Sequence, residues 1–265
     1  MTRDLAEPVG HTATRIYDLH THCSGTDTEE SERMACLLEN AGLVTAAHSP
    51  TFNTPTDGRP TICVYCASGA DNPADLSLAA TVGTEIGRRG WRLISGGGTV
   101  AMMGAVARAA RSAGAHTTGV IPKIFLQSEL ADLDADELVV TDTLTQRKHL
   151  MGERADAFLT LPGGLGTLEE LLESWTAASL GIHHKPVVLL DPAGHYRGLL
   201  DWLEELRQRG FVRASAIDRL VVTTDVDNAF ENLCPTPRST TTAHRTCDTS
   251  PVGARLPHEE VHSPK

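Results

Sequence analysis

The sequence of 265 residues has few aromatic residues, few cysteines and no long apolar run. Phe, Trp and Tyr make up 4% of it, and its six cysteines lie at positions 23, 36, 63, 66, 234 and 247. Such sparse cysteines exclude a disulfide framework in a chain of this length. No stretch approaches the roughly 18 to 20 uncharged apolar residues that cross a bilayer, so a membrane span is excluded. The N-terminus lacks the apolar core of a secretory signal, and we expect a cytoplasmic protein.

Basic residues are also scarce. The chain has 23 Lys and Arg against 34 Asp and Glu, which gives a formal net charge of −11. Because sequence-independent affinity for nucleic acids depends on clustered Lys and Arg, this acidic balance argues against a nucleic-acid partner. Any anionic ligand must therefore be held by backbone amides or by a few well-placed cations.

Two short clusters of possible metal ligands lack the partners that a metal site needs. Cys63 and Cys66 have no second pair at zinc-ribbon spacing, and they lie in an apolar run that is typical of a buried strand. His20, His22 and Cys23 lie in a polar, irregular stretch without a partner motif. We therefore expect no metal, and we interpret Cys63 and Cys66 as small hydrophobic residues of the core.

Composition divides the chain into three segments. Residues 1–59 contain one helical pattern at about 28–41, followed by a linker rich in Pro and Thr. Residues 235–265 have few apolar residues and no periodicity, which predicts a disordered tail. Residues 60–234 alternate short β-branched runs with longer helical patterns. The predicted strands are 61–66, 91–95, 116–121, 138–141, 157–161, 186–190 and 220–223, and the predicted helices are 73–89, 99–113, 144–155, 167–180, 196–209 and 226–233.

This alternation predicts an α/β fold with a parallel sheet covered by helices on both faces, flanked by the two terminal extensions. The strands are continuous apolar runs, as expected for strands that are buried on both sides. Right-handed crossovers place the carboxyl ends of all parallel strands along one edge of the sheet. We expect the ligand to bind at that edge.

Two loops on this edge are rich in glycine. One spans 95–99 and the other spans 162–167, and each connects a predicted strand to a predicted helix. Glycine permits sharp turns and close approach of the backbone to a ligand, and the free amides of a helix start favour an anion. The loops therefore indicate a phosphorylated ligand. The first loop lacks the acidic residue, about twenty positions further on, that binds a ribose hydroxyl in dinucleotide sites. The second loop lacks the Gly-Lys-Ser/Thr sequence of a nucleoside triphosphatase.

Charged residues accompany the second loop. Glu169 and Glu170 are expected in the first turn of the helix that starts at Thr167, where the helix dipole favours a carboxylate. A carboxylate beside a phosphate is nevertheless unfavourable unless it has a function. Arg147 and Lys148 begin the preceding helix and lie on the same edge of the sheet. We expect a cation for the phosphate and a carboxylate for chemistry to converge there.

Several motifs resemble the Lonely guy (LOG) family of cytokinin-activating phosphoribohydrolases. The segment PGGLGTLEE at 162–170 matches that family's P-G-G-x-G-T-x-x-E signature, with Glu170 at its last position. Further segments are similar to the family in the same order along 60–234: ICVYCASG at 62–69, SGGGTVAMMGAVARAA at 95–110, GVIPK at 119–123 and TQRKHLM at 145–151. Several motifs in register make this resemblance more specific than either glycine loop.

The resemblance implies a Rossmann-like homodimer that hydrolyses the N-glycosidic bond of cytokinin riboside 5′-monophosphates, and of AMP in some members. The products are the free adenine-type base and ribose 5-phosphate. The implied catalytic residues are Arg147 and Glu170, and no metal or organic cofactor is implied. Two alternatives remain open: a general purine nucleotide nucleosidase of salvage, and a non-catalytic carrier of a nucleotide or of the molybdenum cofactor on the same fold.

We assign the remaining substrate contacts by combining the loops with the resemblance. The 5′-phosphate is expected at Gly163, Gly164, Gly166 and Thr167, with Lys148 beside Arg147 as a cation on the same edge, and the ribose phosphate or its approach at Gly97, Gly98 and Thr99. Ser68 and Met103 are candidates for the rest of the nucleotide, although a methionine in this position is also typical of the core. The chain also departs from the family. Thr145-Gln146 replaces a common His-Glu, and Ala101-Met102 replaces a common Gly-Leu. These departures leave base specificity open.

Overall fold

The computed structural model describes residues 15–18, 58–69, 72–126 and 131–234, and of residues 15–18 it describes the backbone only. The helix expected at 28–41 and the tail expected at 235–265 lie outside the described residues. All of the expected strands and helices between 60 and 234 can be compared with the structure.

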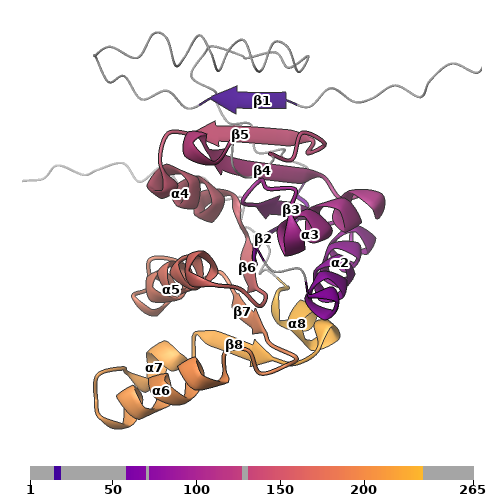
Figure 1. Cartoon of the computed structure of the whole chain (residues 1–265). Helices are drawn as coiled ribbons and strands as arrows, with labels where there is room; N and C mark the ends of the chain where they lie inside the picture. Colours follow the sequence, from indigo (N-terminus) through magenta and orange to yellow (C-terminus); the bar gives the residue numbers. More distant parts are fainter. Residues whose placement is uncertain (1–14, 19–57, 70–71, 127–130, 235–265) are drawn as a thin grey trace, which may run out of the picture. The chain divides into compact units, whose positions relative to one another are not determined.

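The described residues form one sheet of eight parallel strands (Figure 1). Its order is β1-β5-β4-β3-β2-β6-β7-β8. The expected strands are all confirmed, whereas β1 was not anticipated because it is a four-residue strand inside a polar segment. The strands are Arg15–Asp18 (β1), Thr61–Tyr65 (β2), Arg92–Ser95 (β3), Thr117–Pro122 (β4), Glu137–Thr141 (β5), Ala157–Thr160 (β6), Val187–Leu190 (β7) and Leu220–Thr223 (β8).

Helices connect the strands, and each expected helix is confirmed to within two residues at either end. The short helix α7 and the 3₁₀-helix η1 were not anticipated. The helices are Pro73–Arg88 (α2), Ala101–Ser112 (α3), Lys123–Phe125 (η1), Leu144–Arg154 (α4), Leu165–Ser179 (α5), Arg197–Gln208 (α6), Ala214–Ile217 (α7) and Val226–Asn232 (α8). None of the helices in these described ranges combines the length and apolarity that a membrane span needs.

The sheet separates two hydrophobic clusters, so the fold is a three-layer α/β structure, as predicted. Ile62 and Val64 of β2 pack with α2, α3 and α8 on one face. Cys63 and Tyr65 point to the other face and pack with α4, α5 and α6. Burial raises the pKa of the thiols of Cys63 and Cys66, which keeps both thiols protonated. The interpretation of these cysteines as core residues is confirmed.

The strand order places a topological switch point between β2 and β6. From β2 the chain adds β3, β4 and β5 to one side, and from β6 it adds β7 and β8 to the other. The connection after β2 leads to α2 on one face of the sheet, whereas that after β6 leads to α5 on the opposite face. Loops that diverge in this way leave a crevice at the carboxyl ends of the two strands, where α/β proteins bind ligands.

The first turn of α3 contains an unusual backbone conformation. Ala101 has a φ of 48°, in the left-handed region, and it is the one non-glycine residue with a positive φ among those described. In this region the Cβ atom lies too close to the backbone carbonyl, at a cost of roughly 1 to 2 kcal/mol. A glycine at this position would avoid that cost, because it has no Cβ atom.

We therefore expect Ala101→Gly to raise the free energy of unfolding by about 1 kcal/mol. Urea denaturation monitored by circular dichroism measures this change. Ala105→Gly in the same helix is the matched control, since Ala105 has ordinary helical geometry and packs against the core. The control should lose about 1 kcal/mol. Equal destabilisation of both variants would contradict the assignment of strain to Ala101.

Candidate active site

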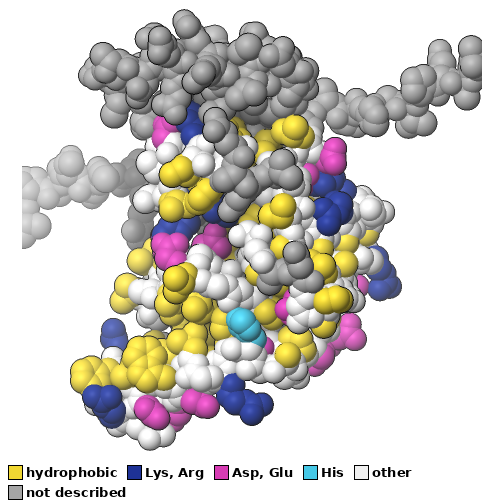
Figure 2. Space-filling model, viewed as in Figure 1, with side chains coloured by type: hydrophobic (Ala, Val, Ile, Leu, Met, Phe, Trp, Pro, Cys, Tyr) yellow, Lys and Arg dark blue, Asp and Glu magenta, His cyan; other side chains and the backbone are white. Residues whose placement is uncertain are grey.

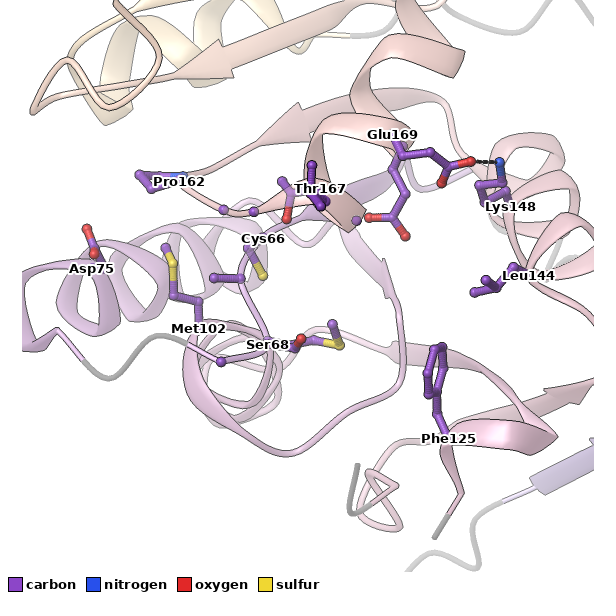
Figure 3. Close-up of a pocket in the computed structure, with 18 of the residues that line it drawn as sticks. Cys66, Ser68, Asp75, Met102, Phe125, Leu144, Lys148, Pro162, Thr167 and Glu169 are labelled. Carbon is purple, nitrogen blue, oxygen red and sulfur yellow. Dashed lines mark hydrogen bonds and ion pairs between the residues drawn. The ribbon is translucent and has the colours of Figure 1, made fainter. Parts of the chain in front are cut away.

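A cavity of about 560 Å³ lies at the switch point (Figure 3). Among the described residues, its walls are the loops after β2, β6 and β7, the starts of α2, α3, α4 and α5, and η1. The volume lies within the range of small-molecule sites, which is roughly 300 to 1,000 Å³. The edge of the sheet predicted to bind a ligand is thus the edge that carries this cavity.

A buried ion pair joins α4 to α5 in the cavity wall. The Nη2 atom of Arg147 lies 3.4 Å from Oε1 of Glu170, and the two side chains are 10% and 11% exposed. α4 crosses from β5 to β6 and packs against β2, β3 and β4 on the way. This crossing carries Arg147 toward the switch point, so the predicted convergence of a cation and a carboxylate is found.

Gly96 provides the space that the Arg147 guanidinium occupies. A Cβ atom built on Gly96 would lie 1.8 Å from Nη2 and 2.9 Å from Cζ of Arg147. Such distances are far below van der Waals contact, so a side chain at this position would displace the guanidinium. The sequence pattern indicated a glycine loop here but assigned its function to the residues that follow Gly96.

The rest of the first glycine loop packs inside the protein. Gly97 has a φ of 77°, and its carbonyl oxygen accepts the N–H of Asp132 at 2.8 Å. The N–H of Gly98 donates to Sδ of Met103 at 3.1 Å. Gly97, Gly98 and Thr99 are not part of the cavity lining. Gly97 packs against β4 instead. The expected contact of these three residues with the ligand stays a prediction.

The second glycine loop presents backbone amides to the cavity. Helix α5 begins at Leu165, two residues before the expected start, and no side chain caps it at Gly164. Its first intrahelical bond runs from the N–H of Leu168 to the Gly164 oxygen at 3.0 Å, so the amides of residues 165–167 precede the helical ladder. Gly163, Gly164, Gly166 and Thr167 all line the cavity, as expected. An uncapped helix start of this kind favours an anion.

The earlier start of α5 corrects the interpretation of the two glutamates. Its first turn holds no acidic residue, so Glu169 and Glu170 are too far along the helix for the expected stabilisation by the dipole. Cations of α4 face them instead. Arg147 pairs with Glu170. Lys148 pairs with Glu169, and the dashed line in Figure 3 marks this second pair.

The positive charge of Lys148 is neutralised by neighbouring carboxylates. Its ammonium group pairs with both Glu169 and Glu173. Burial disfavours its charged form, but these two carboxylates outweigh burial and raise the pKa of Lys148 above its ordinary value. Lys148 does line the cavity. Its positive charge is nevertheless matched by two negative charges, which weakens its attraction for a phosphate.

The cavity also contains residues that the sequence motifs did not single out. Ser68 and Met103 line it as expected, while Asp75, Phe125, Leu144 and His195 were missed. In Figure 3, Asp75 and Pro162 lie at one end of the lining, and Phe125 and Leu144 lie at the other. Only one signal could have indicated His195: it follows the predicted strand 186–190 at the carboxyl edge of the sheet.

Comparisons with known proteins give the family. Residues 103–233 match a family described as possible lysine decarboxylase. A cytokinin riboside 5′-monophosphate phosphoribohydrolase of Mycobacterium marinum is 51% identical over 185 residues, which are 70% of this chain and 99% of that protein. The chain belongs to the Lonely guy family of phosphoribohydrolases. It is therefore a hydrolase, in agreement with the expectation from its motifs.

Other members of the family are similar over shorter parts of the chain. The enzyme of the same name from Mycobacterium tuberculosis is 52% identical over 66% of this chain and 94% of its own length. One from Arabidopsis thaliana is 42% identical over 58% of this chain and 73% of its own length. The similarity thus extends from bacterial to plant proteins.

Solved structures support the fold. The molybdenum cofactor binding protein of Rippkaea orientalis has a TM-score of 0.52 and 24% identity, over 65% of this chain and 94% of that one. The molybdenum cofactor carrier protein of Chlamydomonas reinhardtii has a TM-score of 0.51 and 25% identity over the same shares. The predicted Rossmann-like sheet is confirmed.

The close approach of Gly96 to Arg147 gives a testable prediction for this member of the Lonely guy family. Gly96→Ala should displace the guanidinium and lower kcat/KM for nucleotide hydrolysis by about 100-fold. The variant should still fold, because the displaced atoms are the end of a flexible side chain, and thermal unfolding checks this. Gly152→Ala on α4 is the matched control, since a Cβ atom there meets nothing within 4 Å. Activity of Gly96→Ala within twofold of the parent would contradict the positioning role of Gly96.

Proposed function

We propose that the protein hydrolyses the N-glycosidic bond of cytokinin riboside 5′-monophosphates and of AMP. Water is consumed, and the products are the free adenine-type base and ribose 5-phosphate. One observation carries this proposal: the buried pair of Arg147 and Glu170 lies in the same cavity as the uncapped start of α5. The relatives named cytokinin riboside 5′-monophosphate phosphoribohydrolases support the choice of substrate.

Glu170 stabilises the sugar during bond cleavage. Positive charge develops on C1′ and on the ring oxygen as the base departs. A carboxylate beside the sugar stabilises this oxocarbenium-like state, and it orients or deprotonates the attacking water, as carboxylates do in glycoside hydrolysis. Its partner Arg147 lies 3.4 Å away and holds the carboxylate in place.

Arg147 acts through its charge. A guanidinium does not deprotonate under ordinary conditions, so Arg147 is no general acid. Negative charge accumulates on the departing base, and a fixed cation at the edge of the cavity stabilises that charge. The proton that the base finally takes comes from another source, for which water is our candidate.

Backbone amides hold the 5′-phosphate. The N-terminal amides of α5, together with the side chain of Thr167, supply hydrogen-bond donors without a full positive charge. Ser68 adds a hydroxyl from the loop after β2. The apolar side chains of Phe125, Leu144 and Met103 provide the surface for the base and its N6 substituent. The cavity volume of about 560 Å³ accommodates a nucleotide of this size.

The hydrolase is favoured over a carrier of the molybdenum cofactor. Hydrolases of this name reach 52% identity with the chain, whereas the carrier of Chlamydomonas reinhardtii reaches 25%. The ion pair of Arg147 and Glu170 also serves bond cleavage better than simple binding, since a carboxylate near a bound phosphate weakens its affinity. A general purine nucleotide nucleosidase uses the same groups, and substrate preference distinguishes the two hydrolases.

We place this activity in residues 60–234, with 1–59 and 235–265 as extensions of the catalytic domain. Every described residue that lines the cavity falls within 60–234. Assembly as a homodimer and a cytoplasmic location remain predictions. Hydrophobic side chains gather on the face that carries α5, α6 and α7 (Figure 2), and Leu165 and Phe211 are among those exposed. Such a face is compatible with a contact between two copies.

The decisive experiment is product chromatography with AMP, GMP and isopentenyladenosine monophosphate. We expect release of the free base and ribose 5-phosphate, fastest from the isopentenyl nucleotide. Equal rates for all three nucleotides would favour the general nucleosidase. Absence of ribose 5-phosphate from every reaction would favour the carrier.

Glu170→Gln should lower kcat by about 10² to 10⁴-fold, because it removes the charge of the carboxylate at almost unchanged volume. Binding of AMP, measured by isothermal titration calorimetry, should remain measurable. Glu173→Gln is the matched control, since Glu173 lies on the same helix but pairs with Lys148. Turnover of Glu170→Gln within a few-fold of the parent would contradict the assignment of Glu170.

Arg147→Ala should lower kcat by about 10² to 10³-fold and also raise KM, because it removes the cation and leaves the Glu170 carboxylate without this partner. The buried position of Arg147 means that the variant also loses stability. Thermal unfolding is therefore measured alongside, and assays are run well below the melting temperature. Unchanged kinetics in the folded variant would assign the catalytic cation to another residue.

A further inference from the structure

The turn between β7 and α6 is built rigidly beside the second glycine loop. The buried carboxylate of Asp191 accepts the N–H of His195 at 2.7 Å and the N–H of Tyr196 at 2.9 Å. The two rings meet edge to face, with their centroids 4.6 Å apart. Tyr196 is buried, whereas His195 is exposed and lines the cavity. The backbone of this turn thus holds both side chains in defined positions.

Three consecutive carbonyl groups of the glycine loop have hydrogen-bond donors. The Leu161 oxygen accepts the hydroxyl of Tyr196 at 2.9 Å. The Pro162 oxygen accepts the N–H of Ala67 at 3.2 Å. The Gly163 oxygen lies 2.9 Å from Nε2 of His195. Since a carbonyl oxygen only accepts, Nε2 of His195 carries the proton in this bond.

The bond to Gly163 sets the direction of the next amide. In a trans peptide the C=O and the following N–H point in opposite directions, and no cis peptide occurs among the described residues. When the Gly163 oxygen is held toward His195, the N–H of Gly164 therefore points away from His195. Gly164 lines the cavity and directly precedes the first turn of α5. Gly164 is the N-cap residue of α5, so its N–H lies next in sequence to the uncapped amides of that turn.

We propose that His195 is a positioning residue for phosphate binding, which orients the Gly163–Gly164 peptide so that the Gly164 amide faces the 5′-phosphate. This inference rests on the proposed function, in which the start of α5 holds the phosphate. His195 acts through the backbone and takes no part in bond cleavage. Because Gly163 and Gly164 are both glycines, whose backbone is more flexible than that of any other residue, the chain alone does not fix the orientation of this peptide. An external hydrogen bond is therefore needed to select one orientation.

Two substitutions separate this role from simple packing. His195→Phe keeps an aromatic ring against Tyr196 but removes the donor. His195→Gln places an amide N–H close to the position of Nε2 and should restore the bond. His184→Phe is the matched control, because His184 is exposed and precedes β7 at the opposite edge of the sheet.

The test measures kcat and KM for AMP, and the inhibition constants of ribose 5-phosphate and adenine. For His195→Phe, KM and the inhibition constant of ribose 5-phosphate should rise about fivefold to tenfold, the loss typical of one hydrogen bond. The kcat of His195→Phe and its inhibition constant for adenine should stay within twofold of the values of the parent, because adenine has no phosphate. His195→Gln and His184→Phe should resemble the parent in all four quantities.

Three outcomes would overturn the proposal. These are an unchanged inhibition constant of ribose 5-phosphate in His195→Phe, an equal rise for adenine, and a fall in kcat at constant KM. Calorimetric titration of the parent and His195→Phe with ribose 5-phosphate makes the test independent of turnover. If the parent binds ribose 5-phosphate without hydrolysing any nucleotide, the proposed function fails, and the difference in affinity between the two proteins still decides the role of His195.

Discussion

The ion pair between Arg147 and Glu170 is the interaction on which the cavity depends. Its two residues follow β5 and β6, which are separated in the sheet by β4, β3 and β2. They meet because α4 crosses these strands and because Gly96 leaves room for the guanidinium. Removing one partner of a largely buried pair costs stability, because the remaining charge loses a favourable interaction, so the two residues stabilise each other in the folded protein. The geometry of the site therefore depends on the α4 crossover.

The same crossover creates the switch point. A sheet that grew in one direction only would send the loops after β2 and β6 to the same face, and no crevice would open between them. Here α2 and α5 diverge to opposite faces, so the amides of α5 and the loop after β2 converge on one cavity. The chain topology thus brings groups for an anion and the charged pair to within reach of one ligand.

Most of the fold could be predicted from sequence, because each parallel strand is a short apolar run between helical patterns. The convergence of a cation of the 147–148 segment with a carboxylate of the 169–170 segment was also predictable, since both segments follow strands at the carboxyl edge. The choice of Arg147 and Glu170 came from the resemblance to the family. The roles of Gly97 and Lys148 were not predictable. Gly97 packs against β4, and Lys148 pairs with two glutamates. Such partners depend on strand order and on side-chain geometry, which a glycine motif or a charge does not specify. His195 was missed for the same reason.

An acidic protein that binds an anion must rely on oriented dipoles. The net charge is −11, and the cations in the cavity wall, Arg147 and Lys148, are matched by carboxylates. Backbone amides carry no net charge, but they attract a phosphate only when their N–H bonds point at it. In a glycine-rich loop, the direction of each N–H depends on the hydrogen bond that the carbonyl oxygen of the same peptide accepts. Ala67, His195 and Tyr196 supply the donors of these hydrogen bonds. In the proposed function, neighbouring loops thereby set how well the glycine signature binds the phosphate.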